Sequence, residues 1–198
     1  MNIDFNKKPI VIFTGPSGVG KGTIEKILFE DEELRLKLSC SATTRKPREG
    51  EVNGIHYFFI SKEEFKSKID SNSFLEYSFH FDNYYGTLFE EIDRIHNSNK
   101  IPFLEIETNG AKQILKNVLT NKQYKIITLF LLPPSIEELK SRIENRNTEN
   151  DEAIQKRLLK AEEEISDSNI FQYKIINDDA LKAAKDIKRI ILNEIEKK

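Results

Sequence analysis

A glycine-rich segment that joins an apolar stretch to a helical pattern carries the clearest chemistry in this sequence. The spacing Gly15-x-x-x-x-Gly20-Lys21 is typical of a phosphate-binding P-loop, whose backbone N–H groups turn inward toward an anion. Lys21 adds a mobile positive charge for the outer phosphates, and the helix that follows directs the positive end of its dipole at the same point. The residues predicted to hold the phosphates are Gly15, Pro16, Ser17, Gly18, Val19, Gly20, Lys21, Gly22 and Thr23.

One position departs from the P-loop pattern. The residue after the lysine is normally Ser or Thr, whose hydroxyl binds Mg²⁺, but in this chain it is Gly22. The competing interpretation is a glycine-rich turn between a strand and a helix that binds nothing. The loop spacing, the lysine and both flanking patterns agree with one another, so phosphate binding is the favoured interpretation.

Several arginines are spaced so that they could act together. Arg45 and Arg48 flank a proline in the basic segment 43–48, and their guanidinium groups can converge on one phosphate. The competing interpretation is a solvated basic loop that binds nothing, and from this segment alone it is the more common outcome. Farther along, Arg142 and Arg146 are four residues apart, which predicts that they share one face of a helix.

Three carboxylates occupy positions where a negative charge needs a reason. Glu105 and Glu107 end a predicted strand, and strand alternation places both on the same face, at the edge of the sheet where α/β proteins gather their sites. Glu76 interrupts the apolar stretch 74–77. The competing interpretations are solvated charges at a strand end for the pair, and an outward-facing strand residue for Glu76.

The elements that must position these groups alternate between strands and helices. A strand precedes the P-loop, a helix extends to about residue 33 behind it, and further core strands are predicted at 101–106, 124–132 and 171–176. This order predicts an α/β fold with a parallel sheet flanked by helices. Shorter strands are predicted at 38–41, 57–60 and 74–81, and helices at 61–70, 87–97, 111–119, from 135 to the polar segment 145–151, at 152–166 and at 178–198. The predicted apolar face of the last helix comprises Leu181, Ala184, Ile187, Ile191 and Ile195.

The composition narrows the class of protein. A chain of 198 residues with 38% hydrophobic and 32% charged residues fits one α/β domain with inserted lids. A net charge of −2 gives no overall attraction to nucleic acid or to an anionic membrane. Cys40 is the only cysteine, which excludes an internal disulfide, and no apolar stretch has transmembrane length, so a cytoplasmic protein is expected. The three histidines show no metal-ligand spacing, and surface or packing roles are expected for them.

Motifs along nearly the whole chain resemble those of guanylate kinases, which phosphorylate GMP with ATP. The resemblance extends from residue 9 to about residue 195, and its arginine, glycine and tyrosine positions are more specific than the P-loop, which many families share. The matching segments are Gly15-Pro16-Ser17-Gly18-x-Gly20-Lys21, Thr43-Thr44-Arg45-x-Pro47-Arg48-x-Gly50-Glu51-x-Asn53-Gly54-x-x-Tyr57, Phe74-Leu75-Glu76, Asn83-Tyr84-Tyr85-Gly86-Thr87, Pro133-Pro134-Ser135, Arg146 and Asn177-Asp178.

The resemblance implies a single domain over 1–198 with two lids. The P-loop kinase core would comprise about residues 1–40 and 98–198, the inserted α+β GMP-binding lid about 41–97, and the ATP lid about 142–157. It also implies that the partners are the small molecules ATP and GMP, with Mg²⁺ as the cofactor that accompanies ATP, and that the protein is a monomer or a weak dimer.

The resemblance also assigns individual residues. GMP binding falls to Ser41, Arg45, Arg48, Tyr57, Glu76, Tyr85, Thr87 and Glu107. ATP binding falls, besides the P-loop residues, to Arg146 and Asn177. Catalysis falls to Lys21, Arg45, Arg142, Arg146 and Arg157. The family usually has Asp where this chain has Glu105 and Glu107, so no direct protein ligand to the metal is assured, and Glu105 would act on it through a water.

Two alternatives remain open from the sequence. One is a guanylate-kinase-like binding module without catalysis, which the P-loop lysine and the lid arginines disfavour. The other is a kinase for another nucleoside monophosphate. Glu76, together with the hydroxyl groups of Ser41 and Thr87, favours guanine, because a carboxylate accepts hydrogen bonds from the N1–H and the exocyclic amine of that base.

Overall fold

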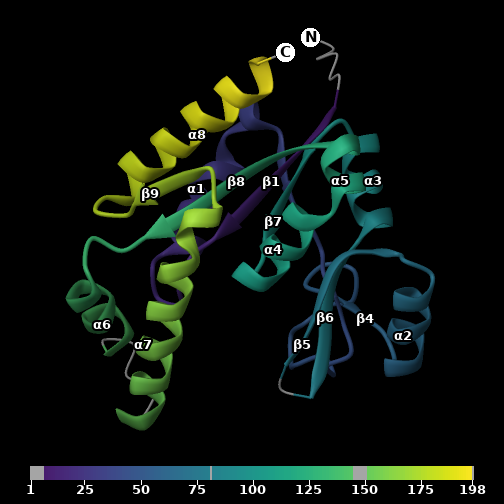
Figure 1. The fold of residues 1–198 in the computed structure, drawn as a ribbon, viewed down its shortest axis with the longest axis horizontal. Coiled ribbons are helices and arrows are strands. Elements are labelled where there is room, and N and C mark those ends of the chain that lie inside the picture. The colour runs from purple at the N-terminus through teal and green to yellow at the C-terminus, as the bar shows by residue number, and fades with distance from the viewer. Residues whose placement is uncertain (1–6, 81, 145–150, 198) are drawn as a thin grey trace.

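The computed structural model describes residues 7–80, 82–144 and 151–197. A five-stranded parallel sheet lies at its centre, in the order β2-β7-β1-β8-β9 (Figure 1). The P-loop strand β1 therefore lies between two strands that follow it much later in the sequence, which confirms the predicted parallel α/β sheet. The strands of this sheet are β1 (Lys8–Thr14), β2 (Leu36–Leu38), β7 (Ile101–Glu105), β8 (Tyr124–Leu132) and β9 (Tyr173–Ile176).

Helices cover both faces of the central sheet, which explains why its strands are apolar without alternation. Along β1, Val11 and Phe13 belong to the core beneath one set of helices, whereas Ile10 and Ile12 belong to the core beneath the other set. The first set is α1 (Lys21–Glu30), α6 (Ile136–Glu144), α7 (Asp151–Ser166) and α8 (Ala180–Glu196). The second set is α3 (Phe89–Asn97) and α4 (Thr108–Lys116), and the short α5 (Val118–Gln123) follows it.

A second, four-stranded sheet has the order β4-β3-β6-β5 and a small core of its own. Its strands are β3 (Ala42–Thr43), β4 (Phe58–Phe59), β5 (Phe74–His80) and β6 (Asn83–Leu88), and helix α2 (Lys62–Asp70) packs against them. The buried ring of Phe65 on α2 stacks on Phe74 with the ring centroids 4.2 Å apart. Ser61 caps the start of α2, since its hydroxyl accepts the backbone N–H of Glu64 at 3.0 Å.

Two arms extend from the same side of the central sheet in Figure 1: the second sheet with α2, and the pair α6 and α7. Two 3₁₀ helices, η1 (Glu32–Leu34) and η2 (Asp167–Ile170), complete the described elements. None of the helices in the described part of the chain combines the length and apolar character needed to cross a lipid bilayer.

Some predicted boundaries are wrong. The strand predicted at 38–41 is the junction between two sheets, because β2 ends at Leu38 and β3 begins at Ala42. The helix predicted at 87–97 begins two residues later, because Thr87 pairs with Glu76 across the antiparallel ladder of β5 and β6. Propensity does not reveal such pairing, which depends on a partner strand eleven residues away.

Two predictions on helices also need correction. The helix predicted at 111–119 is two helices, and the side chain of Asn117 caps the second by accepting the backbone N–H groups of Leu119 and Thr120. On α8, Leu181 is 62% exposed, whereas the predicted face residues Ala184, Ile187 and Ile191 are buried. The helix buries Ala183 in place of Leu181, so its apolar face is rotated slightly at its first turn.

Candidate active site

The P-loop connects β1 to α1, and two of its glycines have backbone conformations that favour glycine. Gly18 and Gly20 have φ values of 87° and 102°, in the left-handed region that residues with a Cβ rarely adopt. A Cβ at Gly20 would also lie 2.6 Å from Nδ2 of Asn177. These positions let the loop curl tightly against the end of β9 before α1 begins.

The ammonium group of Lys21 lies over the loop. Its Nζ donates a hydrogen bond to the carbonyl of Gly15 at 2.7 Å and lies 3.8 Å from Oε1 of Glu105. The lysine therefore bridges the P-loop and the end of β7, where it can reach an anion bound at either place.

Two predicted site residues hold the loop from behind. Nδ2 of Asn177 donates to the carbonyl of Val19 at 2.8 Å, and Asn177 is only 5% exposed. Arg142 donates to the same carbonyl and to the carbonyl of Asn177, both at 3.3 Å, and its Nε donates to Glu138 at 3.1 Å. Both side chains therefore support the backbone of the loop, and an ATP-binding role for Asn177 stays a prediction.

Two cavities meet at the C-terminal end of β7. The P-loop cavity, of about 340 Å³, extends along the loop, and the inter-sheet cavity, of about 360 Å³, lies between the end of β7 and the second sheet. Both are lined by Glu105, Ile106 and Glu107, so the end of β7 forms their common wall. The other residues that line the P-loop cavity are Thr14, Gly15, Ser17, Lys21, Arg157, Lys160 and Glu164.

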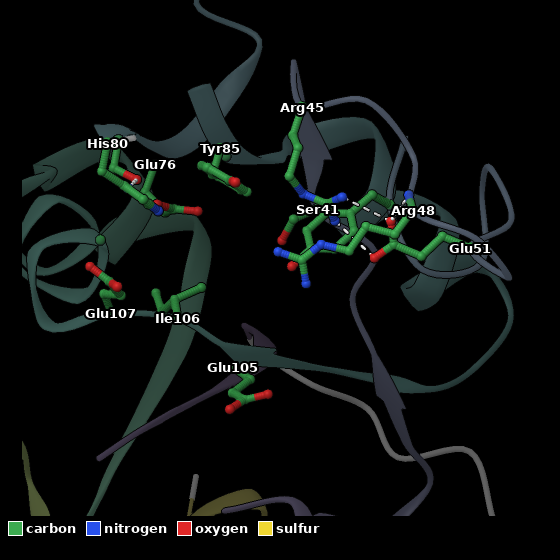
Figure 2. A pocket seen from close by; sticks show the side chains of 14 residues that line it. Ser41, Arg45, Arg48, Glu51, Glu76, His80, Tyr85, Glu105, Ile106 and Glu107 are labelled. Carbon is green, nitrogen blue, oxygen red and sulfur yellow. Dashed lines mark hydrogen bonds and ion pairs between the residues drawn. The ribbon is translucent and has the colours of Figure 1, made fainter. Parts of the chain in front are cut away.

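The inter-sheet cavity has a basic end and an acidic end, which Figure 2 shows on opposite sides of the view. Arg45 and Arg48 lie at the basic end, and Glu76 and Glu107 lie at the acidic end. The other residues that line this cavity are Ser41, Glu51, Tyr57, Ser78, His80, Tyr85, Gly86, Glu105, Ile106 and Gly110.

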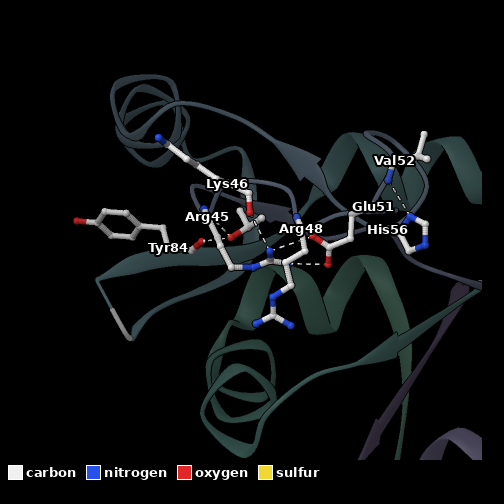
Figure 3. A network of polar contacts seen from close by, with 8 residues as sticks. Arg45, Lys46, Arg48, Glu51, Val52, His56 and Tyr84 are labelled. Atoms are coloured by element: carbon white, nitrogen blue, oxygen red, sulfur yellow. Dashed lines mark hydrogen bonds and ion pairs between the residues drawn. The ribbon is translucent and has the colours of Figure 1, made fainter.

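A carboxylate organises the basic end (Figure 3). Both oxygens of Glu51 accept hydrogen bonds from the guanidinium group of Arg45, at 2.8 and 2.9 Å, and Glu51 also accepts the backbone N–H of Arg48 at 2.7 Å. These hydrogen bonds, that from Arg45 first, lower the pKa of Glu51 to about 2. The Arg45 guanidinium also lies over the ring of Tyr57, 5.4 Å from its centroid. The family motif includes Glu51 and leaves position 49 open, but the sequence assigned no role to Glu51.

The acidic end contains a buried carboxyl group. Glu76 is 6% exposed, and its Oε1 accepts the hydroxyl of Thr87 at 2.7 Å. Burial raises the pKa of Glu76, and the hydrogen bonds from Thr87 oppose that effect. A Cβ at Gly110 on α4 would lie 2.6 Å from Oε2 of Glu76, so the absence of a side chain there makes room for the carboxyl group. The sequence did not reveal a role for Gly110.

Helix α7 supplies one side of the P-loop cavity. Arg157, Lys160 and Glu164 all line it, at a spacing that places them on one face of the helix. Nζ of Lys160 lies 2.9 Å from Oε1 of Glu107 and 3.9 Å from Glu164. Burial raises the pKa of Glu164, and the charge of Lys160 opposes the rise. Of these three residues, only Arg157 was predicted from the sequence, although helical spacing from Arg157 was a signal for the other two.

A second buried carboxyl group lies beside the common wall of the cavities. Glu25 on α1 is hydrogen-bonded to Glu105, and its pKa is raised to about 7, mainly by burial and next by the negative charge of Glu105, while Lys21 opposes the rise. The described residues contain no group of three or more His, Cys, Asp or Glu side chains arranged to hold a metal ion. A cation at this wall would therefore need further oxygen atoms from a bound phosphate or from water.

Comparison with known proteins identifies the family. The family model described as guanylate kinase matches residues 6–194.

The chain belongs to the guanylate kinase family.

The chain is 58% identical to the guanylate kinase of Mycoplasmopsis synoviae (strain 53) over 96% of its own length and 97% of that protein. It is 56% identical to the guanylate kinase of Mycoplasmopsis pulmonis (strain UAB CTIP), over 97% of its own length and 98% of that protein. The crystal structure of the guanylate kinase from Anaplasma phagocytophilum has a TM-score of 0.72 and 28% sequence identity, with 96% of this chain and 88% of that chain covered. The guanylate kinase fold therefore extends over nearly the whole chain.

The structure brings most of the residues implied by the family resemblance to the two cavities. The eight predicted GMP-binding residues all line the inter-sheet cavity except Thr87, which is fully buried behind Glu76 and donates to it.

Arg146 lies outside the described residues, so its predicted catalytic and ATP-binding roles stay predictions. Cys40 is buried. His80, expected to have only a surface or packing role, lines the inter-sheet cavity and stacks on Tyr85 with centroids 4.5 Å apart.

Proposed function

We propose that this guanylate kinase family member transfers the terminal phosphoryl group of ATP to GMP, giving ADP and GDP. The observation that carries the proposal is the common wall at Glu105, Ile106 and Glu107, where the two cavities meet. A donor on the P-loop and an acceptor in the inter-sheet cavity would face one another across the end of β7. Holding both reactants in this way replaces a collision between two molecules in solution. The names of the curated relatives support the same activity.

The transfer itself needs little covalent chemistry from the protein. A phosphate oxygen of GMP is already anionic, so no strong general base is required. That oxygen forms a bond to the γ-phosphorus of ATP while the bond from this phosphorus to the β–γ bridging oxygen breaks, and the electron pair leaves with ADP. Lys21, once a phosphate replaces the Gly15 carbonyl as its acceptor, neutralises charge on the transferred group. Arg157, which lines the same cavity, adds to that positive charge.

The polarity of the inter-sheet cavity suits GMP in one orientation. At the basic end, Arg45 and Arg48 bind the phosphate, with the hydroxyl groups of Tyr57 and Tyr85 as uncharged donors. At the acidic end, Glu76 and Glu107 accept from the N–H groups of guanine. The residues assigned to GMP in this way are Ser41, Arg45, Arg48, Tyr57, Glu76, Tyr85 and Glu107, with Thr87 orienting Glu76. Adenine carries an acceptor at N1, which a carboxylate would repel, so AMP fits this end poorly.

The residues at the P-loop fit a magnesium ion that arrives with ATP. When bound, the ion would neutralise the β- and γ-phosphates. Gly22 has no hydroxyl to offer, but the carboxylate of Glu105 lies at the loop, 3.8 Å from Nζ of Lys21, and carboxylate oxygens are the ligands that Mg²⁺ prefers. We assign Glu105 to the hydration shell of the ion, because Mg²⁺ usually keeps several of its waters.

We also propose that the two arms of the molecule are the lids of the enzyme. The second sheet with α2 would close over GMP, and the segment 142–157, whose described part is the end of α6 and the start of α7 and whose residues 145–150 lie outside the described residues, would close over ATP. Ile92 on α3 belongs to the core of the central sheet, so we place the end of the GMP lid near residue 88 and not at 97. Closure would exclude water and thereby limit hydrolysis of ATP.

The proposal is tested by ADP release. ADP production from ATP and Mg²⁺ is measured with GMP, dGMP, AMP, UMP and CMP as acceptors. Production that depends on GMP and exceeds that with AMP, UMP and CMP by orders of magnitude supports the proposal. A chain that binds GMP but releases no ADP would be a binding module, and equal rates with AMP would remove guanine recognition from Glu76.

A further inference from the structure

The helix that begins at the P-loop lysine carries a buried carboxyl group that the proposed reaction does not use. Glu25 is 8% exposed, and its Oε1 has no hydrogen-bond partner among the described residues. Its carboxyl group is hydrogen-bonded to Glu105 and interacts with the charge of Lys21. Both of these partners line the P-loop cavity. A buried carboxyl oxygen without a partner is costly, which points to a group that binds there during function.

Helix geometry directs Glu25 toward the P-loop. Side chains on a helix lean toward its N-terminus and cover the preceding turn, so Glu25 on α1 leans toward the turn that begins with Lys21. Gly22, three residues before Glu25, has no side chain in that turn. Apart from its two neighbours in the chain and the backbone of the same helix, no heavy atom of the described residues lies within 4 Å of the point where its Cβ would be. The place of the usual P-loop hydroxyl is therefore open, and a carboxyl group lies one helical turn behind it.

The contact between Glu25 and Glu105 needs a positive charge. Two carboxylates at hydrogen-bond distance repel each other unless a proton or a cation compensates them. The charge of Lys21 compensates the two carboxylates in part. In the proposed function, however, its Nζ moves to the phosphates when ATP binds. A divalent cation bound with the phosphates would then supply the missing charge at the same place.

We propose that Glu25 positions the Mg²⁺ that accompanies ATP. Together with Glu105 it would accept hydrogen bonds from water on the ion, and so take over the task of the hydroxyl that the loop lacks at Gly22. This inference rests on the proposed function, because it requires ATP in the P-loop cavity. Glu25 is thus a positioning residue for the cation and touches neither GMP nor the transferred phosphoryl group.

Metal binding tests the inference without turnover. Free Mn²⁺ is followed by its electron paramagnetic resonance signal while it is titrated into the full chain with a non-hydrolysable ATP analogue. Glu25→Gln keeps the size of the side chain and removes its charge, and we expect the Kd for Mn²⁺ to rise about tenfold or more, as is typical when an outer-shell partner is lost. Glu30→Gln, on the exposed side of the same helix, is the matched control and should leave the Kd unchanged. An unchanged Kd in Glu25→Gln overturns the inference.

A second substitution tests the replacement of the hydroxyl. Gly22→Ser, which has open space around it, should lower the Kd for Mn²⁺ in the wild-type chain and restore it in Glu25→Gln. Rescue also shows that the double variant is folded. A folded double variant that binds Mn²⁺ no better than Glu25→Gln would contradict the idea that the two groups share a task. If Glu25→Gln does not fold, a Gly22→Ser chain with unchanged Mn²⁺ affinity gives the same contradiction.

The test separates this inference from the proposed function. If wild-type protein releases no ADP with GMP, the proposed function fails. If it releases ADP but Glu25→Gln binds Mn²⁺ as tightly as wild type, only the role of Glu25 fails.

Discussion

Single side chains of the two cavities are held by partners that a nucleotide would have to replace. Nζ of Lys21 donates to the carbonyl of Gly15, both oxygens of Glu51 are occupied by Arg45, and Glu107 is paired with Lys160. These contacts keep charged groups near the positions in which a phosphate or a base would meet them. These side chains are therefore already ordered before the ligand binds, which reduces the conformational entropy that binding loses.

Lys21 offers the most direct test at this scale. Lys21→Met should lower kcat by at least about 100-fold, because the charge of the lysine matters most as charge develops on the transferred group. The variant should still fold, since the lysine side chain is partly exposed and its replacement is similar in length. Steady-state kinetics and a thermal unfolding curve measure the two effects. Retention of more than about a tenth of the wild-type rate would count against the P-loop as the donor site.

Glu76 should decide base recognition. In Glu76→Gln an amide N–H can face the guanine N–H donors, so kcat/KM for GMP should fall about 10–100-fold while the KM for ATP stays nearly constant. The hydroxyl of Thr87 can still donate to the amide oxygen, which preserves the local hydrogen bond. Kinetics with each substrate varied in turn measure the difference. Unaltered GMP kinetics would show that Glu76 does not bind the base.

Glu25 should make stability depend on pH. Its pKa in the folded chain, about 7, lies above the ordinary value of 4.5, because of burial and the charge of Glu105, with Lys21 opposing. Between these pH values the folded state therefore binds more protons than the unfolded state. The contribution of Glu25 to the free energy of unfolding thus falls as the pH rises from about 4.5 through 7. Glu25→Gln removes that dependence. Its Tm relative to wild type should be a few degrees higher at pH 8 than at pH 5. Parallel Tm curves for both proteins would contradict this account.

At the scale of elements, helix α7 links the two cavities. One face of the helix contributes Arg157, Lys160 and Glu164 to the P-loop cavity, and Lys160 reaches across to Glu107, which also lines the inter-sheet cavity. Movement of this helix would therefore alter both cavities at once. That arrangement suits the lid function proposed for the segment 142–157.

The contribution of Arg157 on α7 to catalysis can be distinguished from the effect of the overall charge of this helix. Arg157→Ala should lower kcat about tenfold or more with little change in the KM for GMP, because the side chain lines the donor cavity and not the acceptor cavity. Lys156→Ala is a matched control on the same helix, since Lys156 forms an exposed i,i+4 pair with Glu152. A defect confined to GMP binding in Arg157→Ala, or an equal defect in Lys156→Ala, would contradict the assignment.

At the scale of the whole molecule, the chain contains separate hydrophobic cores. Two lie on the faces of the central sheet, and a small one lies in the second sheet, formed by Ala42, Phe65, Phe74 and Leu88. The small core is separate from the other two, but Leu75 on β5 packs into a core of the central sheet, so the second sheet is joined to the central one at that strand.

Loss of the small core should therefore affect one substrate more than the other. Phe65 stacks on both Phe74 and Tyr84, and Phe65→Ala should destabilise the second sheet by about 3–5 kcal/mol. We expect the KM for GMP to rise at least about tenfold, while an ATP analogue binds nearly as in wild type. Calorimetric binding of each nucleotide and hydrogen exchange of the two sheets measure this. Equal loss of both nucleotides would show that the two units fold as one.

The sequence determined the elements whose signals are local. Four apolar residues, the glycines of the P-loop and Lys21 predict the strand, turn and helix at the start of the chain, because backbone conformation and helix dipole follow from neighbouring residues. The signal for the long apolar strand at 124–132 is likewise local, and that strand matches the structure. The family resemblance then supplied roles for residues that spacing alone left ambiguous, such as Glu76.

Tertiary structure decided the features that depend on partners distant in the sequence. Thr87 is a strand residue because it pairs with Glu76, and it orients that carboxyl group from a buried position. Glu51, Gly110, Lys160 and Glu25 matter because folding brings them against Arg45, Glu76, Glu107 and Glu105. Burial and the pKa shifts that follow from it are properties of such neighbourhoods. A single sequence does not contain them, because nothing in the local pattern of α1 says which side of the helix will meet the end of β7.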